Sequence, residues 1–511
     1  MFATGGERAA GTRLQRARER YARLLQGLRD AIVAGDLPVG AALPSEHELA
    51  ARYGLGRHSV RRALAALAEE GLVETQAGRG SFVTRPAEGC GRRHTLRLAV
   101  YYPSAQTAKL GGIIQAFEAQ HPLIRIQPLR LHPLGYTQAV AGLIESGHGP
   151  DLVVHMNGML PDLAPQTHLL DLGELMAQRP QLAADLYPLV TRLFQVEGRQ
   201  YGLPFVFSPI VLAYDRQAFR EAGLSLPDPS WTWPDLLDAA QRLTVRVPGE
   251  ARGDGVERVE RYGLYVQVAV NRWLALVLAA GGGLATADGR RSRLGTRASV
   301  EALRFAVDLV HRHGVSGHSP EVHGEALFVL RRAAMVLISH YGADLHQFGT
   351  AGVDWDVTLV PALSAARRRR HLFQATGVAI NRHTPHLRSA VTFLDFLASA
   401  AVQEGIATSG VSLPVRASIA ERVKGGHTRM HPPHVQAYLQ AMEENEHTPP
   451  YFVTSAAVAA HQALLLAFAG LEDIEHACRR AAGVVQTHLD GPRAVGAGAA
   501  LDRGAAGDSA G

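Results

Sequence analysis

The chain has 511 residues, of which 47% are hydrophobic and 19% are charged. This length predicts two or three domains with sizeable cores, and the composition is that of a globular protein. The formal net charge of +5 comes from residues 1–93, which hold 15 arginines, no lysine and 10 acidic residues. Basic and acidic residues balance over the rest of the chain. An excess of arginine at one end indicates a nucleic-acid partner for that end.

The cysteines and the apolar runs exclude several classes of protein. Cys90 and Cys478 are the only two cysteines and have no metal or redox spacing, so we expect no disulfide framework. Residues 1–20 contain no apolar run typical of a secretory signal. The most apolar stretch, residues 454–471, is interrupted by His and Gln and favours a packed helix over a membrane span. We therefore expect a cytoplasmic protein that does not contact a membrane.

Three helices are predicted near the N-terminus, after residues 1–12, which we expect to be disordered. Apolar residues at helical spacing predict the first helix from about Leu14 to Ala34. Ser45 is the expected N-cap of the second, with Glu48 as its capping-box partner. The third is predicted over residues 57–70, where Val60, Leu64 and Leu67 form the buried side and Gly71 follows.

Two short strands follow the third helix. Residues 72–74 and 81–83 flank Gly78-Arg79-Gly80, which predicts a hairpin. Three helices and such a hairpin over residues 13–85 predict a winged helix-turn-helix, in which the second helix of the pair enters the major groove. The alternative is a small helical bundle with a solvated, charged helix.

Arginines at the start of this third helix have the chemistry of base recognition. An Arg fork matches guanine, with about 1–3 kcal/mol of discrimination for each good bidentate contact. Arg on phosphate adds affinity that falls with salt. The hairpin glycines permit close approach to a backbone, and Arg79 is placed to enter a minor groove. The candidate DNA-binding residues are Ser45, His47, Arg57, His58, Ser59, Arg61, Arg62, Gly78, Arg79 and Gly80.

This segment resembles the DNA-binding domain of GntR-type bacterial transcription regulators. The resemblance is carried by AIVAGDLPVGAALPSEHELA, GRHSVRRAL and EEGLVETQAGRGSFV. It implies that Arg57, Ser59 and Arg61 face operator DNA and that Gly78 and Arg79 form the tip of the wing. The chain departs from the family where it has His47 in place of a frequent Arg. It also has Leu55-Gly56 in place of Val-Ser. Both departures bear on which half-site sequence the head recognises, not on whether it binds DNA.

Residues 86–95 are expected to be a linker, after which strands and helices alternate. Buried strands at 96–102, 124–131 and 150–156, with helices at 109–122 and 136–145 between them, predict a parallel α/β sheet. Further on, the sequence predicts an extended segment and two helices, at residues 201–215, 231–244 and 271–280. Residues 481–511 are rich in Ala and Gly, and we expect a disordered tail.

This larger region carries no catalytic motif that we recognise. G-x-S-x-G, H-E-x-x-H and P-loop patterns are absent from the sequence. Four clustered histidines lack matched helical spacing and a nearby Cys, so we expect no metal site there: His311, His313, His318 and His323. The only lysines, Lys109 and Lys424, lie in unsuitable contexts for a pyridoxal phosphate Schiff base. We expect no cofactor and no enzymatic activity.

Residues 96 to about 475 resemble the family 1 extracellular solute-binding proteins, the sugar-binding class of ABC transporters. The resemblance is carried by FEAQHPLIRIQ, ESGHGPDLVVHM, GRQYGLPFVFSPIVLAYDRQAFREAGL, SWTWPDLLDAAQRLT, AAGGGL, RRAAMVLISHYGAD and VAINRHTPHLRSAVTFLDFLAS. It implies two α/β lobes around a ligand cleft. Lobe 1 is then expected over residues 96–204 and 354–409, and lobe 2 over 206–353 and 410–480. The chain should cross near Pro204-Phe205 and near Gly352 to Asp356, and return to lobe 2 from about Gly410.

The same resemblance suggests where a ligand would bind. Sugars are held by aromatic faces and by polar side chains on their hydroxyls. Such residues after predicted strand ends and at crossovers are Tyr136, His155, Asn157, Phe207, Asn271, Trp273, His340, Tyr341 and Gln374. Each could instead serve packing or a surface loop. Trp231 and Trp233 match the family's helix-entry pattern and are expected to pack there.

Together the two resemblances predict a transcription regulator, a repressor, that binds double-stranded operator DNA as a homodimer. Its effector would be a small molecule, a carbohydrate, bound between the lobes. Two alternatives remain open at this point. One is a transport-type solute-binding protein without a regulatory role, and the other is an enzyme fusion of the aminotransferase type.

Overall fold

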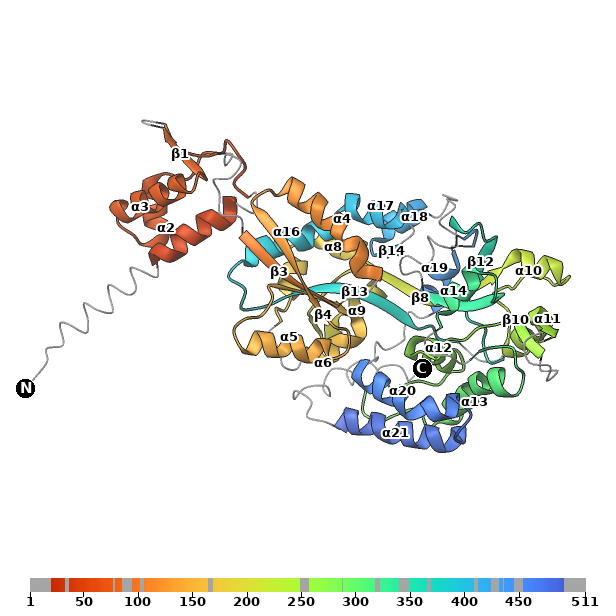
Figure 1. Ribbon diagram of the computed structural model, residues 1–511. Helices are drawn as coiled ribbons and strands as arrows, with labels where there is room; N and C mark the ends of the chain where they lie inside the picture. Colours follow the sequence, from red (N-terminus) through yellow and green to blue (C-terminus); the bar gives the residue numbers. More distant parts are fainter. Residues whose placement is uncertain are drawn as a thin grey trace, which may run out of the picture.

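The computed structural model shows an N-terminal head beside a larger C-terminal domain (Figure 1). It describes residues 20–32, 36–76, 79–84, 94–101, 105–163, 169–248, 257–286, 288–317, 322–339, 348, 350–364, 369–408, 412–423, 432–434, 436–444 and 454–490. Residues 1–12 and residues 491–511 of the predicted disordered tail lie outside these ranges, as does most of the predicted linker. The prediction of disorder is wrong for residues 481–490, which end a helix over residues 474–490 because Ala481, Val485 and Leu489 bury one face of it.

The head, residues 20–84, is a winged helix-turn-helix, as predicted. It consists of a helix over residues 20–32, α2 (Glu46–Tyr53), α3 (Arg57–Glu69) and the antiparallel strands β1 (Val73–Gln76) and β2 (Gly80–Val83). Ser45 forms the predicted capping box with Glu48, which fixes the start of α2. Its core joins all three helices and the hairpin through buried side chains that include Leu24, Leu28, Leu49, Val60, Leu64, Leu67 and Val83.

The C-terminal domain, residues 94–490, is built on one eight-stranded sheet. The main strand order is β11-β8-β13-β5-β3-β4, and β12 and β14 also pair with β8. The strands are β3 (His94–Tyr101), β4 (Ile124–Leu131), β5 (Leu152–Met156), β8 (Leu203–Asp215), β11 (Met335–Ser339), β12 (Trp355–Thr358), β13 (Phe373–Ile380) and β14 (Leu413–Pro414). The prediction of a parallel sheet is right for β3 with β4 and with β5, and wrong for the other pairs, which are antiparallel.

Helices cover this sheet and divide the domain into two lobes (Figure 1). Lobe 1 contains α4 (Ala105–Gln120), α5 (Tyr136–Glu145), η1 (Asn157–Met159), α6 (Leu160–Leu163), α7 (Gly173–Ala177), α8 (Pro180–Asp185), α9 (Pro188–Arg192), α16 (Leu387–Leu397), α17 (Ala400–Thr408) and α18 (Ala417–Val423). Lobe 2 contains α10 (Arg216–Glu221), α11 (Trp233–Leu243), α12 (Val270–Ala279), α13 (Arg297–His311), α14 (Gly324–Val329), α19 (Gln436–Glu444), α20 (Thr454–Phe468) and α21 (Ile474–Asp490). Two hairpins complete the domain. They are β6 (Gln195–Val196) with β7 (Arg199–Gln200) in lobe 1, and β9 (Val245–Pro248) with β10 (Glu257–Arg261) in lobe 2.

The crossings between the lobes differ from the sequence prediction. Residues 203–209 of β8 pair with β13, whereas residues 210–215 pair with β11 and β12, so the first crossing lies at Pro209-Ile210 and not at Pro204-Phe205. Pro209 has no N–H to donate, and Ile210 N donates instead to Leu372 O at 2.9 Å. All 13 residues of β8 are buried, so no change in the sequence pattern marks the place where the strand changes partners.

The return crossings also come later than predicted. Residues 352–356 stay in lobe 2, because β12 pairs with residues 212–215 of β8. The chain returns to lobe 1 between Leu372 and Phe373, where Phe373 pairs with Pro209. It does not leave lobe 1 at Gly410 either, since β14 pairs with Val206 and Phe207 of β8.

The tryptophans at the start of α11 pack as predicted. The Trp233 ring stacks on Phe305 with centroids 4.3 Å apart, and its Nε1 donates to Pro361 O at 3.0 Å. The apolar stretch around residues 454–471 forms α20, which packs on α21 in the core of lobe 2. Among the described residues no single helix is long and apolar enough to span a membrane, although the bent pair α16 and α17 passes the same test together.

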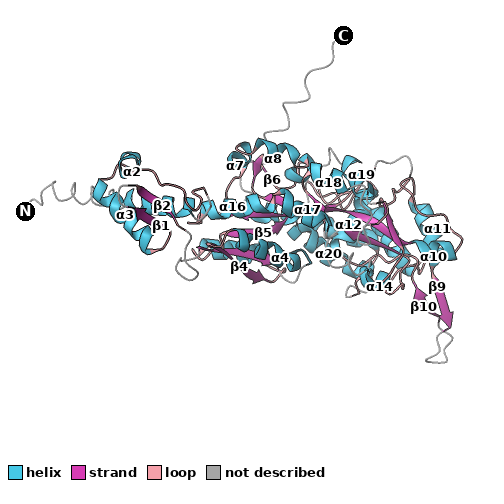
Figure 2. Cartoon of the chain, turned by 90° about the horizontal axis from the view of Figure 1, so that it is seen from above, coloured by secondary structure: helices cyan, strands magenta, loops and turns pink. Residues whose placement is uncertain are grey.

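The head lies at one end of the molecule, next to lobe 1 (Figures 1 and 2). Arg388, in the first turn of α16, lies with its Nη1 3.4 Å from Asp36 Oδ2 of the head. His94 Nδ1, at the start of β3, lies 4.0 Å from Asp30 Oδ1, and Leu123 packs against the core of the head. The head is therefore seated on lobe 1 by polar and apolar contacts as well as by the chain connection.

Reversing the charge of Arg388 should loosen the head. Arg388→Glu places a carboxylate opposite Asp36 and replaces an attraction, worth up to about 1 kcal/mol at an exposed site, with a repulsion. We expect a larger radius of gyration by small-angle X-ray scattering at low salt. Asp36→Arg in the same chain should restore the wild-type value. An unchanged radius in Arg388→Glu would show that this ion pair does not hold the head.

Candidate DNA-binding interface and effector site

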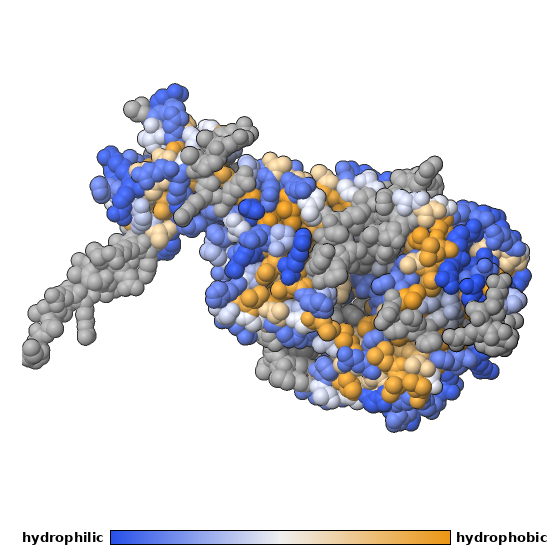
Figure 3. Space-filling model, in the orientation of Figure 1, coloured by the Kyte–Doolittle hydropathy of each residue, from blue (hydrophilic) through white to orange (hydrophobic). Residues whose placement is uncertain are grey.

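The start of α3 presents polar side chains to solvent. Arg57, His58 and Arg61 are exposed, whereas Val60 and Leu64 are buried against the rest of the head. Ser59 is half-buried. The outer face of the head is mostly hydrophilic (Figure 3). The predicted base-reading residues of α3 are thus held on a packed helix, with three of them exposed on its outer face.

Two arginines of α3 have partners within the head. Arg61 Nε donates to both carboxylate oxygens of Glu46, at 2.9 and 2.8 Å. Its side chain is still 68% exposed, so the pair is worth little and a DNA group can compete for it. The Arg62 guanidinium lies 4.4 Å from the centre of the Tyr21 ring, which directs it toward the helix over residues 20–32.

The remaining DNA-binding candidates lie around α2 and the hairpin. Ser45 is engaged in the capping box, where its Oγ accepts from Glu48 N at 3.3 Å. Its hydrogen bonds to Glu48, from the backbone and the side chain, lower the pKa of that carboxyl. His47, Arg79 and Gly80 are exposed, and Gly80 has a φ of 103°, which favours glycine. Gly78 lies outside the described residues.

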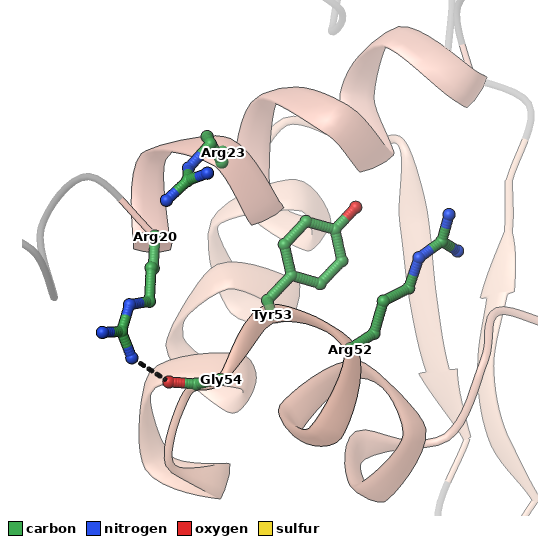
Figure 4. Close-up of a pocket in the computed structure, with 5 residues that line it drawn as sticks. All are labelled: Arg20, Arg23, Arg52, Tyr53 and Gly54. Atoms are coloured by element: carbon green, nitrogen blue, oxygen red, sulfur yellow. Dashed lines mark hydrogen bonds between the residues drawn. The ribbon is translucent and has the colours of Figure 1, made fainter.

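The structure also groups three arginines that the sequence analysis did not select. Arg20, Arg23 and Arg52, with Tyr53 and Gly54, line a hollow of about 490 Å³ on the head (Figure 4). The first two come from the helix over residues 20–32 and the others from the end of α2. Helical spacing alone could pair Arg20 with Arg23, but only the packing of the two helices brings Arg52 beside them.

Four of the effector candidates are buried in the two lobe cores. Tyr136 Oη donates to Val154 O at 2.6 Å, and its ring packs edge-on against Tyr101. Phe207 packs against Tyr187. Trp273 Nε1 donates to His461 Nδ1 at 3.2 Å in the core of lobe 2. In this state of the protein these side chains stabilise the walls of the lobes.

His155 is the fourth of these buried residues. Its ring packs on Phe194 at 5.3 Å between centroids, and a Cβ on Gly202 would lie 2.7 Å from His155 Nε2. Glycine at position 202 therefore lets the backbone pass close to the imidazole. Burial lowers the pKa of His155 to about 4, although a hydrogen bond with Met156 O opposes this shift. The imidazole is neutral at neutral pH.

Two of the three amide candidates bond to each other where the lobes meet, and the third bonds to the backbone of the adjoining residue. Asn157, in η1 of lobe 1, accepts from Ala375 N at 3.1 Å through its Oδ1. Next to it, Gln374 Oε1 accepts from Nδ2 of Asn271, 3.4 Å away, at the start of α12 in lobe 2. Asn271 and Gln374 are both half-buried. The remaining candidates, His340 and Tyr341, lie outside the described residues.

A second contact joins the lobes near this group. Ser455 Oγ, at the start of α20 in lobe 2, donates to Asp162 Oδ1 in lobe 1 at 2.8 Å. Burial raises the pKa of Asp162, although the hydrogen bonds from Ser455 oppose this shift. Neither residue is among the candidates that the sequence indicates. Asp162 follows β5 closely and could have been found from its place after a strand, whereas no sequence signal singles out Ser455.

Comparison with known families accounts for both parts of the chain. The family described as bacterial extracellular solute-binding protein matches residues 103–404. The chain belongs to this family. Residues 20–83 match the family of bacterial regulatory proteins called gntR, so the head is a GntR-family DNA-binding domain. Neither family is enzymatic, and among the described residues no three His, Cys, Asp or Glu side chains gather as a metal site.

Individual relatives match one part or the other. An uncharacterized lipoprotein in the oleD 5′ region of Streptomyces antibioticus is 27% identical over 300 residues, which are 56% of this chain and 62% of the relative. The HTH-type transcriptional repressor NagR of Bacillus subtilis is 41% identical over 66 residues, which are 13% of this chain and 27% of the repressor. The chain thus spans less than two thirds of the length of either relative.

Solved structures show the fold of the solute-binding domain. An ABC substrate-binding protein of Listeria monocytogenes, in complex with cycloalternan, superposes with a TM-score of 0.65. The match covers 78% of this chain and 99% of the Listeria chain, at 19% sequence identity. The predicted two-lobed architecture is therefore confirmed, and the head is an addition to it.

Acid should destabilise the solute-binding domain through His155. Its folded pKa of about 4 lies below the ordinary value of about 6.5, so between these pH values the unfolded chain binds the additional proton. The free energy of unfolding should keep its full value above pH 6.5 and fall by roughly 3 kcal/mol between pH 6.5 and pH 4. We expect urea unfolding of His155→Asn to show a smaller acid-induced loss than the wild type. His148→Asn, at an exposed position, should retain the full loss. An equal loss in all three proteins would contradict this assignment.

Proposed function

We propose that this protein is a transcription repressor whose hold on operator DNA is controlled by a small carbohydrate bound between the two lobes. It acts in the cytoplasm as a homodimer. The observation that carries the proposal is the direct seating of a GntR-family head on lobe 1 of a solute-binding domain, in one chain. The head supplies DNA recognition, and the lobes supply a ligand-dependent change of shape.

DNA binding is supported by the exposed start of α3. Arg57 and Arg61 have the planar fork that recognises guanine in the major groove. NagR, whose matched segment is 41% identical to this head, is named a repressor. A homodimer is proposed because helix-turn-helix proteins read two half-sites whose spacing reflects a two-fold axis.

A carbohydrate effector is supported by the polar group where the lobes meet. Amide side chains offer both donors and acceptors, which match sugar hydroxyls. Asn271 and Gln374 already form one hydrogen bond across the two lobes, and it is long, at 3.4 Å. The Listeria protein of the same fold was solved with cycloalternan, a carbohydrate.

The mechanism we propose is a shift between lobe arrangements. A ligand that contacts both lobes binds one arrangement more tightly and thereby favours it. Within the described residues, only β8 and the segment at Leu372-Phe373 pass from one lobe to the other. A small rotation about Pro209-Ile210 would therefore change the angle between the lobes. Because the head is seated on lobe 1, such a rotation moves lobe 2 of each subunit relative to its own head. In a dimer joined through lobe 2, this changes the spacing of the two heads.

Footprinting on the DNA upstream of its own gene tests the regulator. We expect a protected site that Arg57→Ala with Arg61→Ala abolishes, because both guanidinium groups are lost from the exposed face of α3. Arg297→Ala with Arg312→Ala removes the same charge from exposed positions of α13 and should leave protection unchanged. Ligand binding with no protection in any ligand state would favour the transport-type alternative.

A thermal-shift screen of mono- and oligosaccharides tests the effector. A ligand at 100 times its Kd stabilises the folded state by about 2.7 kcal/mol. We expect at least one sugar to raise the melting temperature, and Asn271→Ala or Gln374→Ala to reduce that shift. Gln138→Ala, on an exposed face of α5, is the matched control. A shift with amino acids or polyamines alone would contradict the carbohydrate assignment.

A further inference from the structure

The hollow on the head is lined by positive charge from two helices. Arg20 and Arg23 lie on one side of the Tyr53 ring and Arg52 on the other (Figure 4). Arg20 Nη1 donates to Gly54 O at 2.9 Å, and the Arg52 guanidinium lies 5.8 Å from the centre of the Tyr53 ring. Gly54 has a φ of 63°, and a Cβ there would lie 3.2 Å from Arg20 Nη1. Glycine thus permits both the turn and the approach of Arg20.

No acidic side chain balances these arginines within the described part of the chain. Arg20, Arg23 and Arg52 form no ion pair with any described residue, and none of the five lining residues is acidic. Four acidic residues of the head are engaged elsewhere, in the pairs Glu46–Arg61, Glu70–Arg29 and Asp36–Arg388 and in the capping box of Glu48. Three guanidinium groups around one hollow favour an anion with several oxygens, because the Arg fork matches phosphate geometry.

The position of the hollow also points to a phosphate. Its floor, Tyr53-Gly54, is the end of α2 and leads directly into the turn before α3. Arg57, the first residue of α3, is only three residues beyond Gly54. Residues that flank the start of a recognition helix lie beside the edge of the major groove, where backbone phosphates fix the register of the protein.

We propose that Arg20, Arg23 and Arg52 form a phosphate-binding site on the head, separate from the base-reading face of α3 and from the wing. Its occupant is a phosphoryl group, and the backbone of the DNA that α3 enters is the source that the position favours. This source rests on the proposed function, whereas the anion site itself does not. The site adds affinity that is independent of sequence and sensitive to salt.

The test uses the full chain and the double variant Arg23→Ala with Arg52→Ala, which leaves the Arg20–Gly54 hydrogen bond in place. Both removed side chains are exposed, so the head should remain folded. Arg297→Ala with Arg312→Ala is the charge-matched control on lobe 2. In the first arm, affinity for a short random-sequence duplex is measured over a range of salt concentrations. In the second arm, melting is compared in inorganic phosphate and in chloride at equal ionic strength.

We expect the dependence of log K on log salt to be less steep by about 1 in the site variant, because each phosphate contact contributes about 0.9 to the slope. The control should keep the wild-type slope. If the slope is unchanged but only the site variant loses stabilisation by phosphate, the anion site is upheld and its occupant is free phosphate. An unchanged slope without such stabilisation would overturn the proposal. Loss of phosphate stabilisation in a chain that binds no duplex at all would uphold the site and refute the regulator.

Discussion

Strand β8 is the element on which the rest of the solute-binding domain depends. Its 13 residues are all buried, and they pair with β13 and β14 in lobe 1 and with β11 and β12 in lobe 2. One continuous strand thus belongs to both lobes. Pro209 lies where the partners change, and it offers no N–H for a ladder hydrogen bond at that place. A single strand shared by both lobes, with the partner change at one position, is the hinge on which the proposed lobe rotation depends.

The head adds a second constraint, because it is seated on lobe 1 alone. Asp36 and Asp30 face Arg388 and His94, and Leu123 of lobe 1 joins the core of the head. Burial, with His386 beside it, lowers the pKa of His94, so this contact holds a neutral imidazole at neutral pH. A domain fixed to one lobe follows that lobe when the angle changes. This asymmetry is the physical basis of the coupling that we propose between a ligand and the heads.

The sequence identified polar and aromatic side chains at strand ends as ligand candidates, and the structure separates them into two groups. Tyr136, His155, Phe207 and Trp273 pack in the cores, where their rings fill space between the sheet and the helices that cover it. Asn271 and Gln374 meet across the lobes. In the sequence alone, an aromatic residue after a strand is equally compatible with packing in a core and with binding a sugar. The placement of α12 beside β13 brings Asn271 and Gln374 together.

Local chemistry was sufficient to determine the head. A capping box, helical spacing and a glycine hairpin act within a few residues, so the sequence alone specified α2, α3 and the start of the recognition surface. The two families were also readable from motifs. Tertiary structure alone decided where the lobes exchange strands, which side chains meet between them, and that Arg52 joins Arg20 and Arg23. These outcomes depend on pairing and packing between residues far apart in the chain, and no local pattern encodes such contacts.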